Sequence, residues 1–79
     1  METTRISMTH LRAWRVYRLL SQRELAKISG LNKATVMSLE NDQYRANFGT
    51  VRKLAAALKI EPEELAWTAP NLPDEQLAA

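Results

Sequence analysis

The sequence predicts an all-α fold, a compact bundle of five short helices in one domain. Three observations predict it. Apolar residues recur at the three- and four-residue spacing that gives a helix one buried face. Residues that favour helix starts, such as Ser21 and Asn32, precede these apolar runs, and no stretch alternates apolar and polar residues as a half-buried strand does. A chain of 79 residues suits one such domain with a modest core.

The first helix is expected over residues of about 9 to 19, with Thr9 as its N-cap. Leu11 and Trp14 fall at helical spacing, which makes Trp14 a core residue. Leucine rarely adopts a positive φ, so Leu19 is expected to continue this helix by one residue.

A second helix is expected to begin after Ser21. The run Ser21-Gln22-Arg23-Glu24 has the form of a capping box. In this motif the serine hydroxyl accepts a hydrogen bond from the backbone amide of Glu24, and the Glu24 carboxylate accepts one from the backbone amide of Ser21. Leu25, Ala26 and Ile28 supply apolar positions. The helix is expected to end at Gly30, because glycine adopts the positive φ of a sharp helix exit without strain.

Three more helices follow. The third is expected from Lys33 to Asn41 behind the N-cap Asn32, and the fourth from Phe48 to Leu58 behind Asn47. Pro62 suits the first position of a fifth, short helix that ends near Trp67. The inner face of the fourth helix is predicted to consist of Phe48, Val51, Leu54, Ala55 and Leu58.

The charges are divided unevenly along the chain. All 11 Lys and Arg lie in residues 1–60 with four acids, a net charge of +7, whereas residues 61–79 carry five acids and no base, a net charge of −5. This asymmetry favours a polyanionic partner for the first part of the molecule. We therefore divide the chain into a helical domain, 1–67, expected to meet a polyanion, and an acidic, proline-containing C-terminal tail, 68–79.

Several function classes are disfavoured. The chain has no cysteine and one histidine, His10, so neither a metal site nor a cofactor is expected. It offers no pairing of a nucleophile with a base, and an enzyme is not expected. No run of apolar residues approaches the length of a signal peptide core or a membrane span, which predicts a cytoplasmic protein without a membrane partner.

The second and third helices carry the functional signal. Ala26 is small enough to let them cross closely, and Gly30 permits the tight turn between them. Val36 and Leu39 would be buried in the core and so anchor the third helix. Its outward residues, which contain no acid, would then protrude as a helix that fits the major groove of DNA, and these residues are Lys33, Ala34, Thr35, Met37 and Ser38.

At these positions the chain resembles the Cro and phage-repressor family of helix-turn-helix regulators. The likeness spans residues of about 8 to 66, through Ser21-Gln22-Arg23-Glu24-Leu25-Ala26, Gly30-Leu31, Thr35-Val36, Leu39-Glu40-Asn41, Lys53-Leu54-Ala55-Ala56-Ala57-Leu58 and Glu63-Glu64-Leu65. The resemblance implies the five-helix fold of phage-repressor DNA-binding domains. Two positions depart from the family, because Leu19 and Asp42 stand where glycine is usual.

The resemblance also implies roles for individual residues. It assigns DNA phosphate to Gln22 and Asn41, with Ser21 and Arg45 in support, and a structural pair to Arg15 and Glu40. It assigns base edges to Lys33, Ala34 and Ser38. Thr35 joins this last group by its position alone.

The sequence thus predicts a transcriptional regulator, most simply a repressor that binds a palindromic operator in double-stranded DNA as a homodimer, because one short helix contacts few base pairs. Trp67 is expected either to cover the domain or to join a dimer contact. The alternative is an antitoxin-type regulator, in which Trp67, Leu72 and Leu77 of the acidic segment fold on a basic partner protein.

Overall fold

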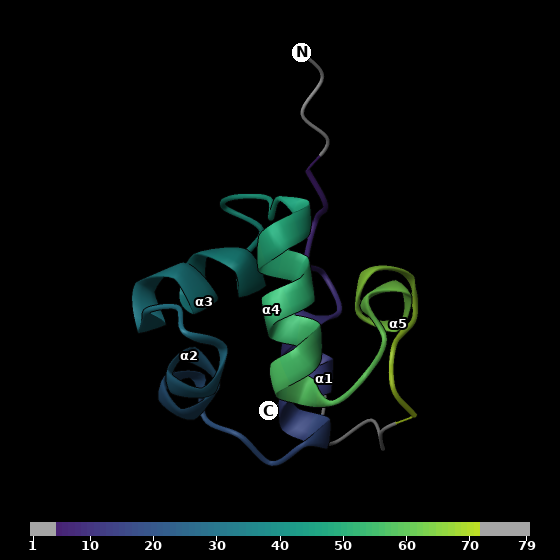
Figure 1. Ribbon diagram of the computed structural model, residues 1–79, viewed down its shortest axis with the longest axis horizontal. Coiled ribbons are helices and arrows are strands. Elements are labelled where there is room, and N and C mark those ends of the chain that lie inside the picture. Colours follow the sequence, from purple (N-terminus) through teal and green to yellow (C-terminus); the bar gives the residue numbers. More distant parts are fainter. Residues whose placement is uncertain (1–4, 72–79) are drawn as a thin grey trace.

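A computed structural model describes residues 5–71 of the chain. This part contains five α-helices and no strand, which confirms the predicted fold class. Helix α4 stands in the middle, with α2 and α3 on one side of it and α5 on the other (Figure 1). The helices are α1 (Leu11–Tyr17), α2 (Gln22–Ser29), α3 (Lys33–Glu40), α4 (Phe48–Leu58) and α5 (Pro62–Trp67).

Side chains cap the N-termini of three helices where the sequence predicts it. The Ser21 hydroxyl accepts the amide of Glu24, and the Glu24 carboxylate accepts the amide of Ser21 at 2.8 Å, so both halves of the capping box are present. The side-chain oxygens of Asn32 and Asn47 accept the amides of Thr35 and Thr50 and so cap α3 and α4, without a reciprocal partner. The predicted N-cap Thr9 is wrong: His10 occupies that position without a side-chain bond, and α1 begins at Leu11.

Each of the helices α1 to α4 is followed, within two residues, by a residue of positive φ, and all four turns share one hydrogen-bond pattern. The amide of that residue bonds to the carbonyl three residues back, and the next amide bonds to the carbonyl five residues back. Leu19 therefore does not continue α1 as predicted, since its φ is 58°. The four residues are Leu19, Gly30, Asp42 and Lys59.

The core lies between α4 and the other helices. Most predicted inner positions are buried, Trp14 among them at 7% exposure. Phe48 is a correction, because its side chain is 54% exposed and lines a surface hollow with Pro62 of α5. As the first residue of α4 it lies beyond the buried stretch of that helix, which begins at Val51. Ile28 is also exposed rather than buried.

The N-terminal segment pairs with the loop between α3 and α4. Ile6 and Ala46 form an antiparallel bridge, with amide-to-carbonyl distances of 2.7 and 2.8 Å. On either side of the bridge, Arg5 donates to the carbonyl of Arg45 and Ser7 donates to Asp42. The sequence contains no strand pattern that predicts this contact.

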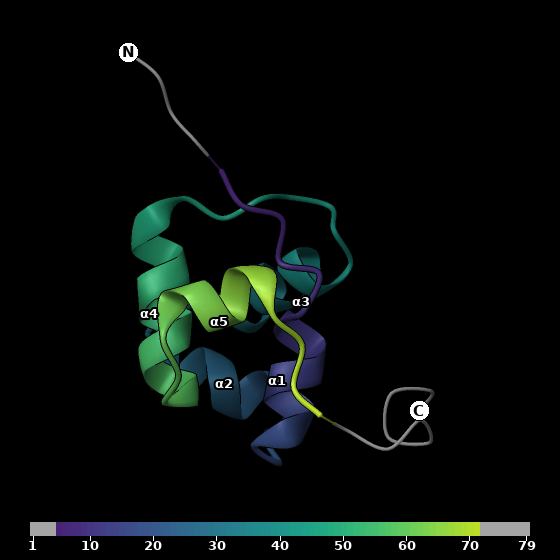
Figure 2. The same ribbon diagram turned by 90° about the vertical axis from the view of Figure 1, so that its right-hand side faces the viewer.

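The chain that follows α5 returns to α1. The indole nitrogen of Trp14 donates to the carbonyl of Thr68 at 2.7 Å, and the segment runs beside α1 (Figure 2). Leu72 and Leu77 of the predicted tail lie outside the described residues. Within residues 5–71, no helix is both long and apolar enough to span a bilayer.

Candidate nucleic-acid interface

Helices α2 and α3 form the predicted helix-turn-helix. Gly30 has a φ of +78°, and the amide of Leu31 bonds back to the carbonyl of Ala26 at 3.0 Å. A Cβ at Gly30 would meet no atom within 4 Å, so the position requires glycine for its backbone conformation and not for space. Ala26 is buried at the base of the turn, where α2 packs against α3.

One side of α3 is anchored in the core and the other faces outward. Val36 and Leu39 are fully buried. Lys33 and Ala34 are exposed, and Thr35 and Ser38 are half-buried. The four predicted base-reading positions thus lie on the outward half of α3, as the helical spacing from the two buried residues requires.

Three of these positions, Ala34, Thr35 and Ser38, border a shallow hollow of about 350 Å³ on the protein surface. No acidic residue lines it, so nothing in its wall repels phosphate or the electronegative edges of bases. Tyr44, from the loop after α3, completes the wall and is 45% exposed. The helical pattern could not indicate this tyrosine, because it belongs to an irregular loop. The lining residues are Asn32, Ala34, Thr35, Ser38 and Tyr44.

The N-terminus of α2 carries two of the predicted phosphate ligands, Ser21 and Gln22. The first amides of a helix have no partner within the helix and attract anions. The amide and the hydroxyl of Ser21 hold the pKa of Glu24 below its usual value, so this carboxylate stays ionised and remains bound in the cap. The Ser21 oxygen also accepts the amide of Glu24 at 3.0 Å.

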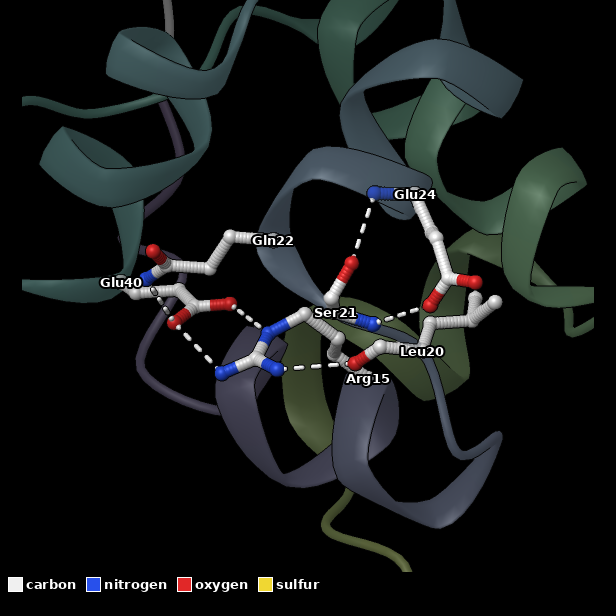
Figure 3. A network of polar contacts seen from close by, with 6 residues as sticks. All are labelled: Arg15, Leu20, Ser21, Gln22, Glu24 and Glu40. Atoms are coloured by element: carbon white, nitrogen blue, oxygen red, sulfur yellow. Dashed lines mark hydrogen bonds and ion pairs between the residues drawn. The ribbon is translucent and has the colours of Figure 1, made fainter.

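A polar network joins α1, α2 and the end of α3 (Figure 3). Arg15 Nε lies 2.5 Å from Glu40 Oε2, and the side chains are 13% and 3% exposed. Arg15 also donates to the carbonyl of Leu20 at 2.8 Å. The Gln22 amide nitrogen donates to Glu40 Oε1 at 3.0 Å, which leaves its second N–H and its carbonyl oxygen for another partner.

The two other predicted phosphate ligands follow α3. Asn41 caps the C-terminus of α3 and is exposed. Arg45 is exposed four residues later, and its carbonyl accepts the bond from Arg5 at 3.3 Å. The bridge between Ile6 and Ala46 therefore brings the guanidinium group of Arg5 to the same loop, a neighbour that the sequence alone does not reveal.

The match to a known protein family decides the classification. A family model described as helix-turn-helix matches residues 11–65, which is most of the chain. The chain belongs to the helix-turn-helix family. The resemblance to the Cro and phage-repressor type is thereby confirmed, and the protein is a DNA-binding transcriptional regulator.

Solved structures agree with this classification. The restriction-modification controller protein C.AhdI from Aeromonas hydrophila is 42% identical, with 72% of this chain and 86% of that chain covered and a TM-score of 0.70. A hypothetical transcription factor from Neisseria, NHTF, is 26% identical over 99% of this chain and 92% of its own, with a TM-score of 0.73.

The P22 c2 repressor, solved in complex with a synthetic operator, shares the fold. It is 23% identical, with 81% of this chain and 97% of that chain covered, at a TM-score of 0.70. A search of the curated proteins found no match to this helix-turn-helix protein.

Proposed function

We propose that this protein is a cytoplasmic transcriptional repressor that binds a palindromic operator as a homodimer, with α3 in the major groove. One observation carries the proposal: α3 presents an exposed, acid-free surface beside the N-terminus of α2, while its opposite side is anchored in the core. An α-helix fits the major groove, which is about 12 Å wide. The anion-binding end of α2 would then meet the phosphate backbone.

Four residues of α3 are proposed to contact bases. Lys33 would donate to guanine O6 and N7, and the methyl group of Ala34 would contact a thymine methyl. Thr35 and Ser38 border the same hollow and would reach neighbouring base edges.

Four further residues are proposed to contact phosphates on either side of the groove. Ser21 and Gln22 would bind from the start of α2, with the free N–H of Gln22 as the donor. Asn41 and Arg45 would bind from the loop after α3. Such contacts fix the position of the protein without sequence preference.

The exposed face of α4 and α5 is the proposed dimer surface. Phe48 and Trp67, which are 54% and 69% exposed, border the apolar hollows of this face. Its larger hollow, of about 460 Å³, is also lined by Arg52 and Glu63. A two-fold axis that passes between Arg52 and Glu63 would bring Arg52 of one copy opposite Glu63 of the other, and the two charges would then attract across an apolar contact.

Selection of bound DNA from a random pool tests the proposal. Two inverted half-sites about 34 Å apart are expected. In mobility-shift titrations, Lys33→Ala should relax the preference at one base position, with a discrimination loss of about 1–3 kcal/mol, whereas Gln22→Ala should weaken all sequences alike. Binding that is insensitive to salt, or an unpaired half-site, would contradict the proposal.

Sedimentation analysis tests the dimer surface. Phe48→Glu places two like charges in an apolar contact and should abolish the dimer. Ile28→Glu, an equally exposed position outside that face, serves as the control and should leave the dimer intact. Equal sedimentation of both variants as dimers would place the interface elsewhere.

The alternative is an antitoxin-type regulator whose C-terminal segment binds a partner protein. The exposed Trp67, which precedes the acidic segment, favours it. A small toxic protein encoded beside this chain should then co-purify with residues 1–79 and not with residues 1–71. Retention of such a partner by the shorter chain would contradict this alternative.

A further inference from the structure

Another hollow, of about 280 Å³, lies where the end of α1 meets α2 and the C-terminus of α4. None of its lining residues belongs to α3. Its floor is apolar, and Ile28 leaves 57% of its surface exposed there. Arg18 and Lys59 supply two positive charges, and no acid lines it. The lining residues are Arg18, Leu20, Ile28, Ala57, Leu58 and Lys59, and we call this site the α1–α2–α4 hollow.

The hollow is suited to a carboxylate in spite of the helix end beside it. The last carbonyls of a helix carry a partial negative charge that would repel an acid. Here Arg18 donates to the carbonyls of Leu58 and Lys59, at 2.7 and 3.2 Å. The guanidinium group thus covers those oxygens and leaves the hollow with a positive potential.

The chain that follows α5 contacts α1, and Arg18 at the C-terminal end of α1 lines the hollow. Trp14 holds the carbonyl of Thr68 at 2.7 Å, and Trp14 lies four residues before Arg18 in the sequence. Four helical residues correspond to a rise of about 6 Å. The eight residues that follow Asn71 can extend over roughly 26 Å, which is several times this rise along α1.

The composition of residues 72–79 complements the hollow. The segment contains Leu72, Asp74, Glu75 and Leu77, and no base. We infer that residues 72–79 bind the α1–α2–α4 hollow of their own chain, with leucine side chains on its apolar floor and carboxylates beside Arg18 and Lys59. A short tether gives an effective concentration in the millimolar range, so modest contacts suffice. This inference does not depend on DNA binding.

Disulfide trapping tests the inference. The chain has no native cysteine, so only the introduced thiols can form a disulfide within it. Ala57→Cys with Leu77→Cys places one thiol in the hollow and one in the tail. Ala56→Cys with Leu77→Cys is the matched control, because Ala56 is the exposed neighbour on the same helix and does not line the hollow. In a glutathione buffer, the effective concentration of the thiols should be at least about fivefold higher for the first pair. A smaller ratio would overturn the inference.

Two further measurements protect the test from artefacts. The pair Ile28→Cys with Leu77→Cys places the first thiol at another residue that lines the hollow. Because Ile28 is exposed, this variant should fold even if the Ala57 variant does not. Its effective concentration should exceed the control by the same factor and fall in 1 M salt, where the Debye length is about 3 Å. Disulfides that form mainly between two chains would overturn the inference, because the tail would then occupy a second copy.

Discussion

The two turns that flank α2 have the same backbone geometry and different residues. Leu19 has a φ of 58° before α2, and Gly30 has a φ of 78° after it. Both turns show the same pair of backbone hydrogen bonds. Only one contains glycine, so the residue type alone does not decide where a helix ends.

Contacts from outside the turn explain the difference. Arg15 donates to the carbonyl of Leu20, one residue past Leu19, while its guanidinium group also binds Glu40 of α3. The side chain of Leu20 packs against the core. The turn at Leu19 is therefore held by tertiary contacts, whereas Gly30 adopts its conformation without strain. The buried ion pair fixes a backbone turn as well as the position of α3.

The largest expected effect comes from Glu40→Ala, which removes the partner of Arg15. An ionised group left unpaired in a mostly buried site is costly, so the free energy of unfolding should fall by about 3 kcal/mol. Urea denaturation measures it. Lys53→Ala, at an exposed position of α4, is the control and should change stability by less than about 0.5 kcal/mol. Equal losses for both variants would show that the ion pair does not hold the turn.

Gly30→Ala should destabilise the protein by about 1–2 kcal/mol. No atom lies near the added Cβ, so the loss measures the cost of positive φ alone. Urea denaturation is again the measurement. Gly49→Ala provides the control, because Gly49 has no positive φ and its nearest contact to a built Cβ is 3.5 Å. An unchanged stability for Gly30→Ala would show that this turn also depends on outside contacts.

Leu19→Gly should instead raise the free energy of unfolding, by about 0.5–1 kcal/mol. Relief of the left-handed leucine exceeds the entropy that glycine adds to the unfolded chain. The leucine side chain is 88% exposed, so its removal costs little burial. Thermal denaturation should show a higher Tm. A lower Tm would mean that the side chain contributes more than its exposure indicates.

The smallest effect concerns pH and the cap of α2. Because the pKa of Glu24 is lowered in the folded state, its contribution is complete above the ordinary value of 4.5 and is lost as pH falls through the folded pKa. The Tm of the wild type should exceed that of Glu24→Gln at pH 7, and the gap should close towards pH 3. A Tm difference of the same size at both pH values would show that the ionised Glu24 carboxylate does not stabilise the cap.

Local signals were enough to predict most of the fold. The capping residues, Gly30 and the apolar spacing act within a few positions, so they predicted five helices and most of the core. The exit at Leu19, the exposure of Phe48 and the bridge at Ile6 depend on contacts between distant segments. Periodicity carries no information on such contacts.

In the candidate site, too, local signals predicted some residues, whereas others depend on contacts between distant segments. Lys33 and its neighbours were located by their distance from Gly30, and the structure places them on the outward side of α3. Their contacts with DNA stay predictions. Tyr44 and Arg5 come from irregular segments that reach the interface only through the folding of the chain, and no local pattern singled them out.

The bridge between Ile6 and Ala46 makes the loop after α3 depend on the segment that precedes α1. When residues 5–7 separate from the loop, Arg45 loses its neighbour Arg5 and Asp42 loses the hydroxyl of Ser7. A substitution that breaks this bridge would therefore change the loop that carries Arg45, although it lies outside α2 and α3.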